Sequence, residues 1–127
     1  MFLDYAGIRV TNLARSVRFF TRGLGLLEVR RGTMPHGGIW VLLADPVSHQ
    51  QLELNWYPRG SRYATPFVPG EGLDHLGVRV PNLRAAGRKL RAVGARKVDE
   101  VRWRGQVGVE YYEGPDQVWV ELILTPS

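Results

Sequence analysis

A nine-residue segment near the start of the chain recurs, without a gap, 70 positions further along (75 − 5). Residues 5–13 read Tyr-Ala-Gly-Ile-Arg-Val-Thr-Asn-Leu and residues 75–83 read His-Leu-Gly-Val-Arg-Val-Pro-Asn-Leu, so five positions are identical. Two later segments, Leu52-Glu53-Leu54 and Val120-Glu121-Leu122, also match at a similar offset of 68 (121 − 53). The duplication spans nearly the whole chain and therefore indicates two copies of one structural unit.

Each copy has the pattern of a strand, a helix and three further strands. Asn12 and Asn82 are good N-caps, so a helix is expected to begin just after each, and Gly94 ends the second helix. Apolar residues then recur at helical spacing, namely Leu13, Val17, Phe20 and Leu24 in the first copy and Leu83, Ala86, Leu90 and Val93 in the second. Strand-like stretches bounded by turn residues follow at 27–31, 39–43 and 51–56, and at 96–101, 108–112 and 118–124.

These patterns predict an α+β fold of two tandem βαβββ modules whose curved mixed sheets surround a central cleft. The modules are expected at residues 1–57 and 73–127, joined by a linker rich in proline and glycine at residues 58–72. At 127 residues the chain has room for a single domain made of these two modules.

Composition removes several classes of function. The absence of cysteine excludes thiolate nucleophiles, disulfide scaffolds and zinc fingers. The formal net charge of +5 raises nucleic acid or an anionic small molecule as partners. Most of the excess charge is arginine mixed with apolar residues on the two helices, so solvated outer faces are expected and no nucleic-acid partner. With no apolar run of about 18 residues and no signal-like start, no membrane association is expected, and the predicted location is cytoplasmic.

Four repeat-related positions are the candidates for chemistry. Tyr5 and His75 are equivalent on the two first strands, and Glu53 and Glu121 are equivalent on the two last strands. Because side chains alternate along a strand, each glutamate points away from its apolar neighbours. The two glutamates either face water on an antiparallel sheet, or line a cleft where, with the imidazole of His75, they bind a hard or borderline divalent cation.

The chain resembles the vicinal oxygen chelate superfamily, and glyoxalase I most closely. The resemblance is carried by Arg9-Val10, the segment from Arg15 to Leu26, Leu52-Glu53-Leu54-Asn55-Trp56, Asp74-His75-Leu76-Gly77-Val78 and Val118-Trp119-Val120-Glu121-Leu122. It implies a glyoxalase-like fold around one divalent metal ion (Ni, Zn, Co, Mn or Fe), with Glu53, His75 and Glu121 at ligand positions. Tyr5 stands where the glyoxalase pattern has histidine or glutamine, so a substrate-binding role is expected for it.

The same resemblance implies a lyase or isomerase that moves a proton through an enediolate when two vicinal oxygens of a small substrate chelate the metal. Glu121 is the expected base and Glu53 shares that role, while Tyr5, Arg9, Asn55, Trp56 and Arg104 are expected to bind the substrate. A glutathione or other thiol adduct is one candidate substrate, and a homodimer is the expected assembly.

The alternative is a metal-free small-molecule binding protein that resembles the bleomycin-resistance proteins. In that case aromatic side chains would hold a flat ligand, among them Trp40, Trp56, Tyr57, Trp103 and Tyr111.

Overall fold

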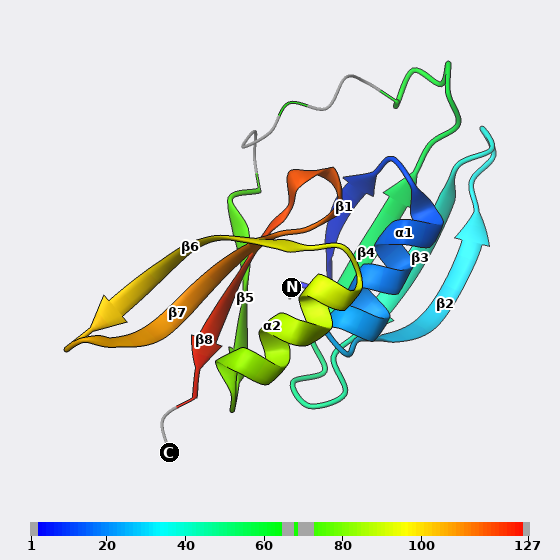
Figure 1. Ribbon diagram of the computed structural model, residues 1–127. Helices are drawn as coiled ribbons and strands as arrows, with labels where there is room; N and C mark the ends of the chain where they lie inside the picture. The colour runs from blue at the N-terminus through cyan, green and yellow to red at the C-terminus, as the bar shows by residue number, and fades with distance from the viewer. Residues whose placement is uncertain (1–2, 65–67, 69–72, 126–127) are drawn as a thin grey trace. The chain divides into compact units, whose positions relative to one another are not determined.

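The computed structural model describes residues 3–64, 68 and 73–125 of the chain (Figure 1). Internal contacts divide the chain into two compact units, Met1–Phe67 and Val68–Ser127. Part of the predicted linker, at residues 65–67 and 69–72, lies outside the described residues, and the predicted module boundaries stay predictions.

The first unit consists of one helix and a four-stranded sheet (Figure 1). Its elements are β1 (Ala6–Val10), α1 (Leu13–Arg18), the π-helical turn η1 (Phe19–Gly23), β2 (Leu27–Thr33), β3 (Ile39–Ala44) and β4 (Gln51–Trp56). The strand order is β1-β4-β3-β2, with β1 parallel to β4 and the other neighbours antiparallel. The sheet is therefore mixed, as predicted.

The second unit repeats this architecture. Its elements are β5 (His75–Val80), α2 (Leu83–Ala92), β6 (Arg96–Trp103), β7 (Gln106–Glu113), the short 3₁₀ turn η2 (Pro115–Gln117) and β8 (Trp119–Leu124). The order is β5-β8-β7-β6, again with only the first pair parallel. The predicted α+β fold of two βαβββ modules is confirmed.

The register of the parallel pair is the same in both units. Gly7 is the partner of Glu53 in the first unit, and Gly77 is the partner of Glu121 in the second. The two offsets seen in the sequence therefore place each glutamate beside a glycine of the neighbouring first strand.

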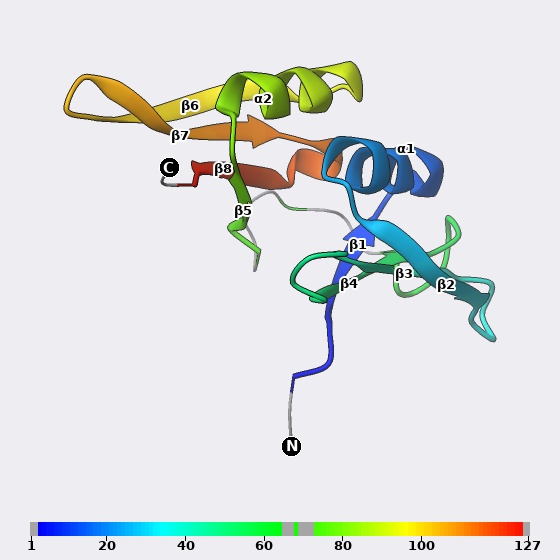
Figure 2. The ribbon, with the colours of Figure 1, turned by 90° about the horizontal axis from the view of Figure 1, so that it is seen from below.

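One helix covers one face of each sheet, as Figure 2 shows for α1 and α2. The β4 residues Leu52 and Leu54 are 8% and 0% exposed, and the β8 residues Val120 and Leu122 are 0% and 1% exposed. Each glutamate lies between such a pair and points to the opposite face, as predicted from strand alternation. We call the face opposite the helix the open face of each sheet.

Both helices begin where the sequence predicts. The Asn12 side chain accepts a hydrogen bond from the Arg15 amide at 3.0 Å, and the Asn82 side chain accepts one from the Ala85 amide at 2.9 Å. The basic residues of the two helices are exposed, as expected for solvated outer faces: Arg15, Arg18, Arg22, Arg84, Arg88, Lys89 and Arg91. Neither helix is long and apolar enough to cross a membrane, nor is any other helix among the described residues.

The predicted buried stripe of the first helix is only partly correct. Phe20 is 1% exposed as expected, but Ser16 and Phe19 are also fully buried, whereas Leu13 and Val17 are only half-buried. The helix then widens into the π-helical turn η1, in which the Leu24 amide donates to the Phe19 carbonyl five residues back. A strict 3.6-residue period therefore does not hold through residues 19–23.

Candidate functional site

On the open face of the first unit, the strand register aligns side chains in two rows that cross the sheet. One row contains Arg30, Leu42, Glu53 and Gly7, from β2, β3, β4 and β1. The neighbouring row contains Gly32, Trp40, Asn55 and Arg9 from the same strands. Because the residues of a row face the same side, charged, aromatic and amide groups gather on one surface.

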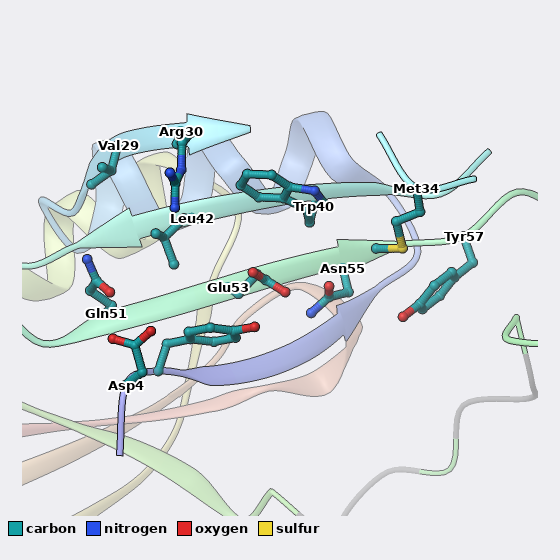
Figure 3. Close-up of a pocket in the computed structure, with 11 residues that line it drawn as sticks. Asp4, Val29, Arg30, Met34, Trp40, Leu42, Gln51, Glu53, Asn55 and Tyr57 are labelled. Atoms are coloured by element: carbon teal, nitrogen blue, oxygen red, sulfur yellow. The ribbon is translucent and has the colours of Figure 1, made fainter. Parts of the chain in front are cut away.

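This surface is hollowed into a pocket of about 830 Å³ (Figure 3). Three residues predicted to act in the site, Tyr5, Glu53 and Asn55, line it. Among the described residues, the pocket is lined by Asp4, Tyr5, Val29, Arg30, Met34, Trp40, Leu42, Gln51, Glu53, Asn55 and Tyr57. The first unit therefore carries one predicted metal ligand in a pocket large enough for a small organic molecule.

Glu53 is half-buried in this pocket and has small or apolar neighbours in its row. Leu42 lies on one side and Gly7, which has no side chain, on the other. Figure 3 shows the carboxylate and the Asn55 amide both directed into the pocket. Such a carboxylate is accessible to a cation or to a substrate proton.

Two other predicted substrate residues, Arg9 and Trp56, line a second and smaller pocket of about 260 Å³. Arg9 donates a hydrogen bond to the Tyr63 carbonyl at 3.3 Å, and the Trp56 indole donates one to the Thr11 carbonyl at 3.2 Å. Both pockets include Tyr57 in their lining. The substrate residues predicted in this unit are thus divided between two adjacent hollows.

In the second unit the two predicted ligands are in direct contact. His75 Nε2 lies 2.9 Å from a carboxylate oxygen of Glu121, and the other ring nitrogen, Nδ1, lies 2.7 Å from the Asp74 carboxylate. The hydrogen bond to Asp74 and the charges of Glu121 and Asp74 raise the pKa of His75 above its usual value. The sequence alone did not single out Asp74 as an orienting group, although its position beside His75 was visible.

Tyr111 completes this cluster. Its ring packs edge-on against the His75 ring, with 5.7 Å between centroids, and it is the β7 partner of Glu121 in the sheet. Burial and the adjacent Glu121 carboxylate raise the pKa of the Tyr111 phenol, so it remains a neutral hydrogen-bond donor. From the sequence alone, Tyr111 is only one of several aromatic residues expected to stack on a ligand.

Arg104, the remaining predicted substrate residue, lies in the turn that joins β6 to β7. Its backbone has a positive φ of 53°, and the following Gly105 has a φ of 79°, which are the values of a two-residue hairpin turn. Arg104 is exposed there. Its role in binding a substrate stays a prediction.

The donors present suit a hard or borderline divalent ion, because they are carboxylate oxygens and an imidazole nitrogen. Within either unit, no three His, Asp or Glu side chains among the described residues gather closely enough to hold a metal. The first unit presents Glu53, and the second presents His75 with Glu121. That these three side chains bind one metal ion stays a prediction.

A repeated βαβββ architecture, with a pocket and acidic side chains on the open face of its sheets, is typical of a small-molecule enzyme or binding protein. The sequence matches the model of the Glyoxalase/Bleomycin resistance protein/Dioxygenase superfamily over residues 2–122. The chain belongs to this superfamily, which confirms the resemblance seen in the sequence.

Individual proteins agree with this assignment. The chain is 28% identical to a lactoylglutathione lyase of Pseudomonas aeruginosa, over 94% of this chain and 80% of that protein. Its fold matches glyoxalase I of Leishmania major with a TM-score of 0.76 at 23% identity, over 98% of this chain and 87% of that one. It also matches the fosfomycin resistance protein FosX of Listeria monocytogenes, solved with Mn(II) and sulfate, with a TM-score of 0.73 at 11% identity, over 98% of this chain and 93% of that one.

Proposed function

We propose that this protein is a glyoxalase I-like, metal-dependent lyase or isomerase that moves a proton on a small substrate with two vicinal oxygens. The observation that carries the proposal is the equivalent placement of Glu53 and Glu121, each beside a glycine on the open face of its sheet. A duplicated chain that keeps an acid at both of these positions provides a paired set of ligands.

In this proposal Glu53, His75 and Glu121 hold one divalent ion, within one chain or across a homodimer. The ion would act as a Lewis acid that polarises the two substrate oxygens and makes the adjacent C–H acidic. The direct contact between His75 and Glu121 supports the pairing, since two of the three donors already lie 2.9 Å apart.

The side chains of the protein then perform the proton transfer and the binding. Glu121 removes the proton and returns it to the neighbouring carbon, with Glu53 sharing the role. Asp74 orients His75 through Nδ1, and the phenol of Tyr111 helps to fix the Glu121 carboxylate. Tyr5 and Asn55 orient the substrate in the larger pocket, and Arg9, Trp56 and Arg104 contribute further contacts.

The relatives support this choice of reaction within the superfamily. The Pseudomonas aeruginosa relative is named for lyase activity on lactoylglutathione, so a glutathione or other thiol adduct is the first substrate to test. The fold shared with a Mn(II)-containing FosX supports a divalent ion, of which Ni, Zn, Co, Mn and Fe are the candidates. We further propose a homodimer that acts in the cytoplasm.

A second candidate function is metal-free binding of a flat small molecule, as in the bleomycin-resistance branch named in the superfamily description. The pocket favours this alternative in one respect, because Trp40, Tyr57, Met34 and Leu42 give it a large apolar wall. Binding proteins of this kind do not need the acidic pair.

Elemental analysis of protein purified without chelator distinguishes the two candidates. The enzyme is expected to contain one Ni, Zn, Co, Mn or Fe ion per site and, when reconstituted, to isomerise the hemithioacetal of methylglyoxal with glutathione or with a simpler thiol. The variant His75→Ala, which removes the nitrogen donor, is expected to lose the metal. Protein that stays metal-free after incubation with each ion contradicts the proposal and favours the binding protein.

A further inference from the structure

We propose that Arg30 and Trp40 form a recognition wall for an aromatic anion in the larger pocket, so that the substrate carries a carboxylate on a planar apolar body. This inference rests on the proposed function in that it names the substrate class of the same site. Its test measures binding alone, and its outcome is therefore independent of metal content and turnover.

Arg30 differs from its neighbour Arg31 in having no acidic partner among the described residues. Arg31 forms a bidentate ion pair with Glu28, with contacts of 2.7 and 2.9 Å. Successive residues of a strand point to opposite faces, so Arg30 is directed to the open face and lines the pocket (Figure 3). Its charge is thus available to a ligand.

Trp40 fixes the position of this cation. The Arg30 guanidinium carbon lies 5.7 Å from the centre of the Trp40 ring, within the range of a cation–π contact. A guanidinium stacked on a ring keeps the N–H groups at its edge available for a carboxylate, which it binds through two parallel hydrogen bonds.

Gly32 is the reason that the indole can lie in this place. Gly32 is the cross-strand partner of Trp40, and a Cβ atom at residue 32 would lie 2.6 Å from the indole ring. Any other residue would displace the ring, because real Cβ atoms do not approach so closely. Because residue 32 has no side chain, the indole of Trp40 can lie flat against the backbone of β2.

The rest of the pocket suits an apolar body between two polar ends. Arg30, Leu42 and Glu53 are successive members of one row, so Arg30 and Glu53 are separated by two strand spacings, or about 10 Å between backbones. The buried Leu42 lies between them, with Trp40 and Met34 in the same wall. A ligand of one or two rings spans this distance.

Charge places the anionic end of the ligand on the β2 side. The carboxylates in the pocket, Asp4 and Glu53, come from the β1 and β4 side, as Figure 3 shows, and would repel a second anion there. Arg30 is the only basic side chain in the pocket lining described by the structure. The vicinal oxygens of the substrate would accordingly face Glu53, and its carboxylate would face Arg30.

The test compares 2-naphthoate with 2-naphthamide, a neutral molecule of the same shape, by calorimetric titration of metal-free protein. The unmodified protein is expected to bind naphthoate about tenfold more tightly, as one charge-assisted interaction predicts. The variant Arg30→Gln is expected to abolish this preference and to leave naphthamide binding unchanged. The matched control Arg31→Gln removes the same charge from the chain and is expected to keep the preference.

A second variant tests the stacking wall separately from the charge. Trp40→Leu is expected to lower the affinity for both ligands at least fivefold. Trp40→Phe keeps an aromatic ring and is expected to retain most of the affinity, and it serves as a control in case the leucine variant misfolds. The inference is overturned if the unmodified protein binds the two ligands with equal affinity, or binds neither at millimolar concentration. It is also overturned if Arg30→Gln and Arg31→Gln lose the preference for naphthoate to the same extent. If the protein binds metal and turns over substrate but shows no preference for naphthoate, only the inference fails. If it prefers naphthoate but neither binds metal nor turns over substrate, only the proposed function fails.

Discussion

Each module places a glutamate at the equivalent position of its own sheet, but the residues around the two glutamates differ. In the first module the row neighbours of Glu53 are Gly7 and Leu42, and its carboxylate opens into a pocket. In the second module Glu121 lies between Gly77 and Tyr111 and contacts His75 at 2.9 Å. Duplication thus preserved the backbone position while the neighbouring side chains diverged. The second module therefore has a carboxylate that is oriented by a neighbouring side chain, and the first has one that is accessible from a pocket.

Substitution of each glutamate in turn is expected to have the largest effect on activity and to separate the roles of the two side chains. We expect Glu121→Gln to lower kcat by about 10²- to 10⁴-fold, the usual contribution of a general base, with little change in substrate binding. We expect Glu53→Gln chiefly to weaken metal binding, with a smaller loss of kcat when metal is saturating. Steady-state kinetics over a metal titration measures both effects.

If the two variants have the same kcat at saturating metal, the two glutamates do not have different roles. The control is Glu113→Gln, which alters a β7 glutamate whose nearest charged partner is Arg96 at 3.5 Å. It removes one negative charge from the second module and is expected to leave kcat within a factor of two.

The two modules also differ in the side chains that pack between the helix and the sheet. In the second module the buried Tyr112 reaches under α2, where the helical residue above its hydroxyl is Gly87. The equivalent positions of the first module hold Leu43 in the strand and Val17 in the helix. A large strand residue is therefore matched by a small helix residue, and a smaller strand residue by a larger one. Packing density is maintained in both modules by different side chains.

Gly87→Ala tests this complementarity. A Cβ atom at residue 87 would lie 2.3 Å from the Tyr112 hydroxyl, so it must displace a ring that is 1% exposed. Overpacking costs about 1–3 kcal/mol, and the better helix propensity of alanine offsets about 1 kcal/mol of it. We expect a net loss of about 1–2 kcal/mol in the free energy of unfolding, measured by urea denaturation.

The double variant Gly87→Ala, Tyr112→Phe identifies the cause of that loss. Removing the hydroxyl leaves the next nearest atom, the ring carbon that carried it, 3.2 Å from the new Cβ. In the Tyr112→Phe background the alanine substitution should therefore cost less than 0.5 kcal/mol or even stabilise the helix, by about the propensity difference. An undiminished cost in that background would show that the clash is not with the hydroxyl.

The role of Tyr111 gives a smaller and more specific prediction. Tyr111→Leu places in the second module the residue type that the first module has at Leu42. We expect kcat to fall about fivefold to tenfold, because one hydrogen-bond donor to the proposed base is lost, with KM nearly unchanged. Tyr111→Phe should reproduce the loss if the hydroxyl is responsible. A normal kcat in the phenylalanine variant would assign Tyr111 a packing role only.

The sequence was sufficient for the features that depend on local pattern. The repeat predicted both βαβββ modules, the asparagine caps marked where the helices begin, and alternation placed both glutamates on the open faces. It was not sufficient for features that depend on strand register. Arg30 and Trp40 are ten residues apart, and they meet only because Gly32 is paired with Trp40. Tyr111 likewise joins the His75 cluster through the pairing of β7 with β8.

The helix that departs from its predicted stripe supplies the smallest expected effect. Ser16 is 0% exposed, and its hydroxyl has no hydrogen-bond partner among the described residues, whereas the equivalent residue of the second module is Ala86. A buried hydroxyl without a partner is destabilising, and alanine has the higher helix propensity, so Ser16→Ala should raise the free energy of unfolding by about 1 kcal/mol. The melting temperature, measured by circular dichroism, should rise by about 4 °C. The reciprocal variant Ala86→Ser should lower the free energy of unfolding, because it introduces the same hydroxyl into the regular helix of the second module. A loss of stability in Ser16→Ala would instead mean that the π-helical turn depends on that hydroxyl, and that the two helices differ in hydrogen bonding as well as in packing.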